Sequence, residues 1–185
     1  MIQVWSSPIR SFHILLILSI LTLFLTEDFK KIHEITGLFV LFLIIFRITY
    51  GIITKNRYEK ISTFFYGLSD IYKFIISILK QKEIRYLGHN PLAGIVMILM
   101  FLILIMMTIS GVIGFAMKEE EGFFAFLITN NFELGKEILH IHHFLSNLLL
   151  ALIGFHLIGV AVSSFLTKEN LAKSIFITGL KRKNQ

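Results

Sequence analysis

Cysteine is absent from this 185-residue sequence, and charged residues are scarce. Without cysteine the chain cannot form disulfides, thiolate metal sites, cysteine-ligated iron–sulfur clusters or covalently attached c-type haem, and it has no cysteine nucleophile. Only 16% of the residues are charged, whereas a globular protein carries about a quarter, and 55% are hydrophobic. Together with a mean hydropathy of +0.77, this composition is typical of a membrane protein.

Motifs of common catalytic and nucleotide-binding centres are also missing. The sequence contains no nucleophile–base pair, Walker loop or dinucleotide fingerprint, so we predict no independent catalytic site. It has no internal repeat, and we predict a single domain over residues 1–185. The net charge of +6 does not indicate nucleic-acid binding, because the positive residues flank apolar segments instead of forming one patch.

Four apolar segments are long enough to cross a bilayer, which takes about 20 residues. They run approximately over residues 11–26, 34–53, 91–117 and 137–166. A cleaved signal peptide is an alternative interpretation of the first segment, but no A-x-A-like cleavage site follows it. The predicted fold class is therefore all-α membrane, a bundle of four transmembrane helices.

The charges between these segments predict their orientation. Residues 54–90 and the tail are rich in lysine and arginine, whereas residues 118–136 are acidic. Because cytoplasmic loops carry the excess of positive charge, we predict that both termini and residues 54–90 are cytoplasmic. The basic residues are Lys55, Arg57, Lys60, Lys73, Lys80, Lys82 and Arg85, then Lys168, Lys173, Lys181, Arg182 and Lys183; the acidic ones are Glu119, Glu120, Glu121 and Glu133.

Residues 61–79 form a weaker apolar stretch between the second and third spans. The apolar side chains of Phe64, Leu68, Ile71, Ile75 and Leu79 recur at helical spacing, and polar residues fall largely opposite them. This pattern predicts an amphipathic helix lying in the membrane interface. A fifth span is the alternative, but it would reverse the C-terminal half of the chain and break the charge rule.

Four histidines lie within the predicted spans or at their ends. His142 and His156 are fourteen residues apart, which places them about 40° apart on one helical face and roughly 21 Å apart along the axis. His13 and His33 belong to the first two apolar segments. An ionisable side chain inside a membrane is costly, and it marks a functional site by default.

The orientation of the spans predicts which histidines pair. His13 and His156 lie toward the cytoplasmic side, whereas His33 and His142 lie near the outer surface. Four paired imidazoles without any cysteine indicate two haem groups, each held by two histidines, an arrangement suited to outer-sphere electron transfer. The alternative is that these histidines are polar helix contacts in a non-redox anchor or assembly subunit. A transporter is a weaker alternative, because no inverted repeat is found.

Two arginines are candidate partners of haem propionates. Arg47 lies inside the second span, where a buried guanidinium needs an anion, although snorkelling to the headgroups would also satisfy it. Arg10 lies one turn before His13 and has the same two interpretations.

Three further histidines have no assigned role. His140 and His143 point away from the face of His156; with His142 and Glu137 they form an alternative surface metal site. His89 precedes the third span and faces either a propionate or water.

Four motifs occur in order over nearly the whole chain. They are Val4-Trp5 with Pro8, Arg10 and His13; Ile32-His33-Glu34 with Gly37; Arg85-Tyr86-Leu87-Gly88-His89-Asn90-Pro91-Leu92; and Ile141-His142 with Asn147-Leu148-Leu149-Leu150-Ala151-Leu152 and His156. In these motifs the chain resembles the bacterial cytochrome b561 and nickel-hydrogenase b-type cytochrome family, four-helix membrane proteins with two haems. The resemblance implies that His13, His33, His142 and His156 are the axial ligands of two haems b.

The resemblance also implies a place in a respiratory chain of the bacterial inner membrane. Electrons would pass between the quinone pool and a c-type cytochrome or hydrogenase-like partner on the outer face. Membrane lipid surrounds such a protein, a quinone is a further expected ligand, and a homo-oligomer is one alternative for its assembly.

Overall fold

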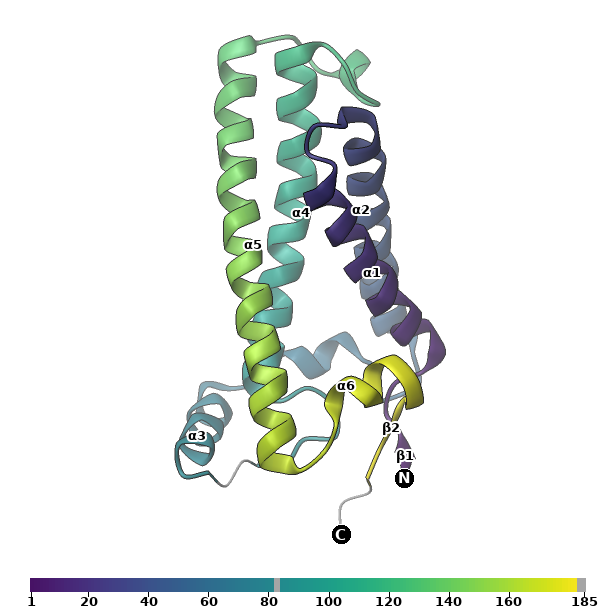
Figure 1. The fold of residues 1–185 in the computed structure, drawn as a ribbon, viewed down its shortest axis with the longest axis vertical. Helices are drawn as coiled ribbons and strands as arrows, with labels where there is room; N and C mark the ends of the chain where they lie inside the picture. Colours follow the sequence, from purple (N-terminus) through teal and green to yellow (C-terminus); the bar gives the residue numbers. More distant parts are fainter. Residues whose placement is uncertain (82–83, 183–185) are drawn as a thin grey trace. The chain divides into compact units, whose positions relative to one another are not determined.

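The structure is a computed structural model that describes residues 1–81 and 84–182 (Figure 1). Lys82 and Lys183, counted above among the basic residues, lie outside the described residues. The elements in chain order are β1 (Ile2–Gln3), α1 (Ser7–Leu25), α2 (Lys30–Ile53), η1 (Ile61–Phe64), α3 (Leu68–Leu79), α4 (Pro91–Glu119), η2 (Ala125–Leu127), α5 (Phe132–Thr167), α6 (Leu171–Lys173), η3 (Ser174–Thr178) and β2 (Leu180–Lys181).

Four helices in the described part of the chain, α1, α2, α4 and α5, are long and apolar enough to cross a membrane. The all-α membrane fold class is therefore confirmed. Three of these helices begin four or five residues before the predicted spans, at Ser7, Lys30 and Phe132. The difference arises because hydropathy detects only the apolar part of a helix, whereas lysine and glutamate are good helix formers and extend it into water.

The segment predicted as one helix over residues 61–79 is divided in the structure. A short 3₁₀ turn, η1, is followed by extended backbone and then by α3. Gly67 precedes α3 with φ −71° and ψ 154°, and glycine is a poor helix former that favours such a break. Phe74 and Ser77 of α3 are buried, whereas the opposite face exposes an apolar stripe of Leu68, Tyr72, Ile75 and Leu79. Placement of α3 in the membrane interface stays a prediction.

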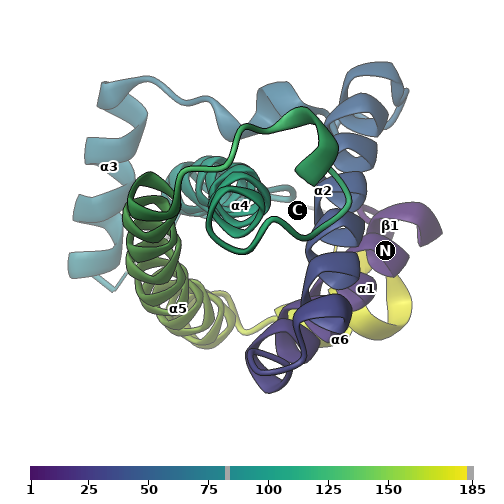
Figure 2. The same cartoon turned by 90° about the horizontal axis from the view of Figure 1, so that it is seen from above.

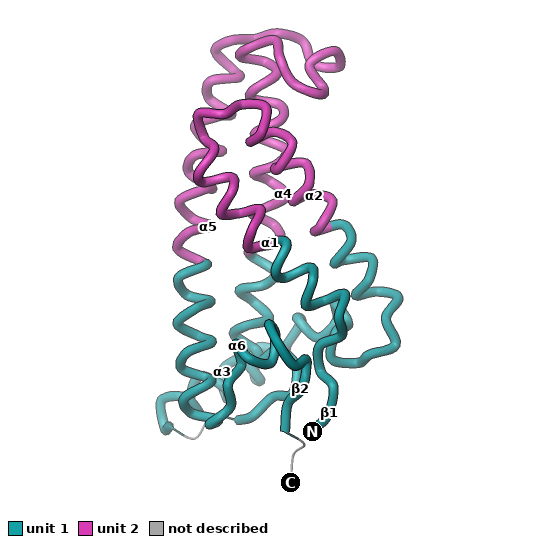
Figure 3. The backbone as a smooth tube through the Cα atoms, turned by 45° about the vertical axis from the view of Figure 1, so that its right-hand side comes forward, with its two compact units in different colours: residues 1–15, 45–99, 153–185 teal, residues 16–44, 100–152 magenta. Residues whose placement is uncertain are grey.

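The chain folds into two compact units (Figure 3). Unit 1 consists of residues 1–15, 45–99 and 153–185, and unit 2 of residues 16–44 and 100–152. Each of the four long helices contributes one segment to each unit. The four predicted ligands divide accordingly: unit 1 contains His13 and His156, and unit 2 contains His33 and His142.

In unit 1 the two ends of the chain pair with each other. Strand β1 runs antiparallel to β2, and the backbone nitrogens of Val4 and Trp5 donate to the Gly179 carbonyl at 2.8 and 3.0 Å. Gly179 has a φ of +69°, and a Cβ at this position would collide with the Trp5 carbonyl oxygen. The turn therefore requires glycine.

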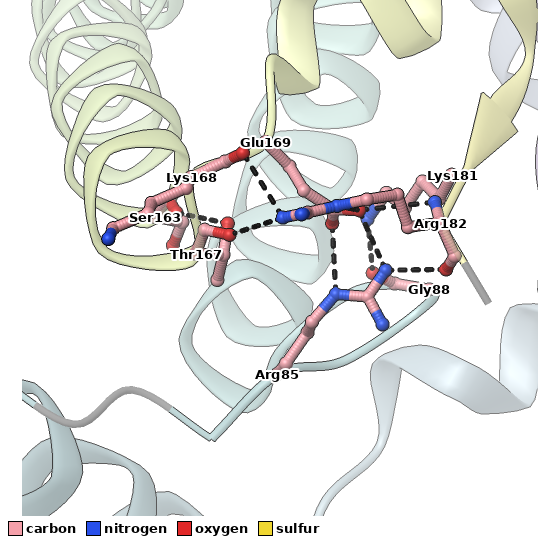
Figure 4. Close-up of polar contacts among 8 residues, drawn as sticks. All are labelled: Arg85, Gly88, Ser163, Thr167, Lys168, Glu169, Lys181 and Arg182. Carbon is pink, nitrogen blue, oxygen red and sulfur yellow. Dashed lines mark hydrogen bonds and ion pairs between the residues drawn. The ribbon is translucent and has the colours of Figure 1, made fainter. Parts of the chain in front are cut away.

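Glu169 anchors the C-terminal segment of unit 1 (Figure 4). Its carboxylate accepts hydrogen bonds from Arg85 Nη2 at 2.7 Å and from the Arg182 backbone nitrogen at 3.1 Å, and its side chain is only 8% exposed. Burial alone would raise the pKa of Glu169, but the hydrogen bonds from Arg85 and Arg182 outweigh it and hold the pKa below its usual value. The carboxylate is therefore ionised at neutral pH, and it joins the tail to the segment before α4.

In unit 2 the connection between α4 and α5 is attached to α2. The Phe123 backbone nitrogen donates to Glu34 Oε1 at 2.6 Å, and Lys30 Nζ forms an ion pair with Glu119 at 3.0 Å. Figure 2 shows this connection from above, where it reaches α2.

Candidate functional site

His33 and His142 face each other within unit 2. Their ring centroids lie 6.2 Å apart, with an angle of 65° between the ring planes. His33 Nδ1 lies 3.1 Å from the Leu23 carbonyl oxygen, and His142 Nδ1 lies 2.9 Å from that of Met107. A carbonyl can only accept, so Nδ1 must carry the hydrogen in both rings. In the neutral ring this tautomer leaves Nε2 with a lone pair available to a metal.

The same two histidines line a cavity of about 230 Å³ in unit 2. Segments of α1, α2, α4 and α5 all contribute to its walls, which are mostly apolar. Gly37 and Gly111 contribute to the lining without side chains. A Cβ at Gly37 would meet open space, whereas a Cβ at Gly111 would lie 3.0 Å from His142 Cε1. Glycine at position 111 therefore leaves room for the observed ring of His142.

His13 and His156 face each other within unit 1. Their ring centroids lie 6.4 Å apart at an interplanar angle of 52°. The ring of Phe176 packs against His13 edge-on, with centroids 5.5 Å apart. His13 Nδ1 is buried and has no hydrogen-bond partner among the described residues.

The separation within each pair fits two imidazoles that bind one metal ion. A metal–imidazole bond is about 2.0–2.1 Å long, and the ring centroid lies about 1 Å behind the ligating nitrogen, so the centroids should lie roughly 6 Å apart. The observed values are 6.2 and 6.4 Å. The interplanar angle is not restricted, because both rings can turn about their common axis. A haem iron, which takes one axial ligand from each side, fits this arrangement.

The alternative surface metal site is not formed. In residues 1–81 and 84–182, no three side chains of histidine, cysteine, aspartate or glutamate are grouped to hold a metal ion. His140 and His143 are both exposed, and only His143 lies beside the ring of His142, with centroids 6.1 Å apart.

Arg47 in unit 1 is buried, and no ion pair neutralises it within the described residues. The residue is 2% exposed, and neither Nη1 nor Nη2 has a hydrogen-bond partner within the described chain. Its guanidinium lies 5.2 Å from the ring centroid of Phe64. A Cβ at Gly51 would lie 2.6 Å from Arg47 Nη1, so this glycine makes room for the guanidinium.

Arg10 contacts the C-terminal segment of unit 1. Its Nε donates to the Ile175 carbonyl at 3.3 Å, and its Nη2 donates to the carbonyls of Phe176 and Ile177 at 3.2 and 2.5 Å. These donors therefore contact the backbone of η3, and a role of Arg10 toward a haem propionate stays a prediction. The sequence could not indicate these backbone contacts, because any residue can offer a backbone carbonyl.

His89 lies between two aromatic rings of unit 1. Its ring centroid is 5.0 Å from that of Trp5 and 4.7 Å from that of Phe64. Burial, and then the positive charges of Arg47 and Lys181, lower the pKa of His89 to about 3. His89 is therefore neutral at physiological pH. Its Nδ1 is buried without a hydrogen-bond partner in the described residues.

Glu59 was not singled out by the sequence, but it is completely buried. Its Oε1 accepts a hydrogen bond from the Ser6 backbone nitrogen, and its Oε2 lies 3.3 Å from the Tyr50 hydroxyl and 3.4 Å from Thr54 Oγ1. The carboxylate thus joins the N-terminal segment to the end of α2.

One family model matches the chain, over residues 4–177, and its description is prokaryotic cytochrome b561. The matched range includes all four long helices and all the candidate residues described above. Neither the curated proteins nor the solved structures gave a match.

Proposed function

The chain belongs to the prokaryotic cytochrome b561 family. From this premise we propose that it holds two haems, each bound by two histidines, and that it transfers electrons between the quinone pool and an outer redox partner. Family membership itself makes it a membrane b-type cytochrome of electron transfer, a multi-pass protein of the bacterial inner membrane. The number of haems, their ligands, the quinone and the partner belong to the proposal.

The observation that supports the proposal most strongly is the presence of two facing histidine pairs. His13 with His156 and His33 with His142 have nearly equal centroid separations, 6.4 and 6.2 Å. Polar contacts between helices require no such repeated spacing. Two equal metal-binding geometries, one in each unit, are what two haems per chain require.

Haem supplies reversible one-electron chemistry when it is bound. His13 with His156 and His33 with His142 would each hold one haem; with both imidazoles engaged, no position would be left for a substrate, so the chemistry supplied would be electron transfer. The backbone carbonyls of Leu23 and Met107 hold the rings of His33 and His142 in the tautomer whose Nε2 can ligate. The mostly apolar walls around these two histidines suit the apolar face of a porphyrin.

Arg47 would neutralise a carboxylate of the haem held by His13 and His156. Its unpartnered Nη1 and Nη2 are buried, and an arginine guanidinium binds a carboxylate in bidentate geometry. No other nitrogen pair in the described chain combines this burial with unused hydrogen-bonding capacity.

The outer partner would approach the acidic connection between α4 and α5. Glu120 and Glu121 are exposed there, whereas Glu119 is paired with Lys30 and Lys118. Charge complementarity therefore favours a partner with a positively charged docking surface.

Quinol oxidation tests the proposed function directly. Membrane vesicles that contain the protein are mixed with a soluble quinol, and the absorbance of reduced haem is followed over time. We expect the quinol to reduce the haem, and an outer electron acceptor to reoxidise it. If dithionite reduces the haem but no quinol does, the quinone pool is not its electron donor.

Single cysteines test the proposed orientation, because the chain has none of its own. Lys60 and Glu121 are both exposed and lie in connections predicted on opposite sides of the membrane. A membrane-impermeant maleimide should label Glu121→Cys in intact spheroplasts but label Lys60→Cys only after lysis. The reverse pattern would place both termini outside.

A further inference from the structure

His89 and Arg47 share one neighbour in unit 1. The His89 ring meets the Phe64 ring at an angle of 88°, with centroids 4.7 Å apart, and the Arg47 guanidinium lies 5.2 Å from the same centroid. His89 Nδ1 and both terminal nitrogens of Arg47 are buried without hydrogen-bond partners in the described part of the chain. Unsatisfied buried groups of this kind are rare in folded proteins, so each requires an explanation.

The carboxylate of Glu59 does not satisfy these groups. Its oxygens accept from Ser6, Tyr50 and Thr54, and it forms no ion pair with Arg47 in the described residues, although its charge acts on Arg47 electrostatically. Lys181 adds a second positive charge near the site, since its Nζ lies 5.8 Å from the Trp5 ring centroid. The region therefore carries more positive than negative charge, and its unused groups suit an anion with at least two acceptor oxygens.

We propose that His89 and Arg47 together bind one carboxylate of the haem held by His13 and His156. This inference rests on the proposed function. Arg47 supplies the charge and the paired N–H donors, and the neutral His89 donates a hydrogen bond from Nδ1. The rings of Trp5 and Phe64 fix the orientation of His89. His89 is thus a residue that positions the haem and has no axial role.

A lipid phosphate offers the same oxyanion chemistry, but the burial of Arg47 favours the haem carboxylate. Arg47 is only 2% exposed, so a headgroup would have to leave the membrane surface and enter the protein. A haem carboxylate reaches the interior together with the haem. The imidazoles of His13 and His156 also lie near enough to His89 to act on it electrostatically.

The interaction can be measured through the midpoint potential of the haem held by His13 and His156, called the inner haem below. A bound cation and a hydrogen-bond donor offset the negative charge of the carboxylate, which favours the reduced iron. We expect Arg47→Gln to lower the equilibrium constant for reduction about tenfold, equivalent to 59 mV for one electron. His89→Phe keeps the aromatic packing but removes the donor, and should lower the constant severalfold. His89→Gln, which keeps an N–H donor, should restore part of the loss.

The measurement is a spectroelectrochemical titration of purified protein, with the haem of His33 and His142 as the internal reference. His140→Phe is the matched control, because His140 is exposed and lies in the other unit. The same titration in a His142→Ala background would assign the shifted wave to the inner haem. Arg47→Lys replaces Arg47→Gln if the latter does not fold, and a smaller shift in the same direction is expected.

An experiment with haem whose propionates are esterified distinguishes a haem carboxylate from a lipid phosphate as the bound anion. Apoprotein reconstituted with iron protoporphyrin IX dimethyl ester should show a shifted inner potential, and His89→Phe should then cause no further shift. The inference is wrong if His89→Phe leaves both midpoint potentials unchanged in protein with natural haem. It is also wrong if His89→Phe shifts the potential of the inner haem equally with natural and with esterified haem. The second result would indicate a lipid phosphate. Protein without any haem would instead overturn the proposed function itself.

Discussion

Replacing His142 with alanine is expected to reduce the haem content from two per chain to one, whereas replacing the adjacent His143 leaves it at two. His142 faces His33 across 6.2 Å, and its Nδ1 is held by the Met107 carbonyl. His143 is exposed. Loss of one axial imidazole leaves a five-coordinate iron that the protein holds weakly.

The haem that stays bound in each variant shows which two histidines hold it. In His142→Ala the spectrum and potential of the haem held by His13 and His156 should be unchanged, because these ligands belong to unit 1. His156→Ala should give the converse result. Haem content is measured as pyridine haemochrome per mole of protein. If His143→Ala loses a haem and His142→Ala does not, the ligand assignment and the helical-phase argument both fail.

Replacing Glu59 with leucine should destabilise the protein by on the order of 3 kcal/mol. The substitution leaves the part-buried Ser6 N–H without its acceptor, removes one hydrogen-bond partner of Tyr50 and of Thr54, and deletes a carboxylate that acts electrostatically on Arg47. For a chain of this size the loss corresponds to a fall of about 6–12 °C in the midpoint of thermal unfolding. Release of haem on heating is the measurement.

Two variants control this experiment. Glu59→Gln keeps an acceptor oxygen for Ser6, so its midpoint should lie between those of Glu59→Leu and the unaltered protein. Glu121→Gln removes an exposed carboxylate and should have little effect. An unchanged midpoint in Glu59→Leu would show that the buried carboxylate does not stabilise unit 1.

The parts of the fold that depend on periodicity and hydropathy could be predicted from the sequence. Four long apolar segments require four spanning helices, and the fourteen-residue spacing of His142 and His156 fixes their common face. The break at Gly67 was not predicted, because the apolar spacing continues through residues 65–67 while the backbone becomes extended. Periodicity describes side chains and does not detect a local change of backbone conformation.

Contacts to the backbone could not be predicted at all. The carbonyls of Leu23 and Met107 orient two histidines, and those of Ile175, Phe176 and Ile177 engage Arg10, yet carbonyls carry no sequence signature. Glu59 was missed for a related reason. It lies in a polar connection whose sequence indicates exposure to solvent, but contacts with Ser6, Tyr50 and Thr54 accompany its burial.

The haem content of the purified protein tests the central proposal most directly. Protein produced with an adequate haem supply is analysed as pyridine haemochrome, and carbon monoxide is then added to the reduced sample. We expect two b-type haems per chain and no spectral change with carbon monoxide, because two imidazoles occupy both axial positions of each iron. A single haem would show that one histidine pair does not bind iron, and a colourless protein would contradict the proposal of a dihaem electron carrier.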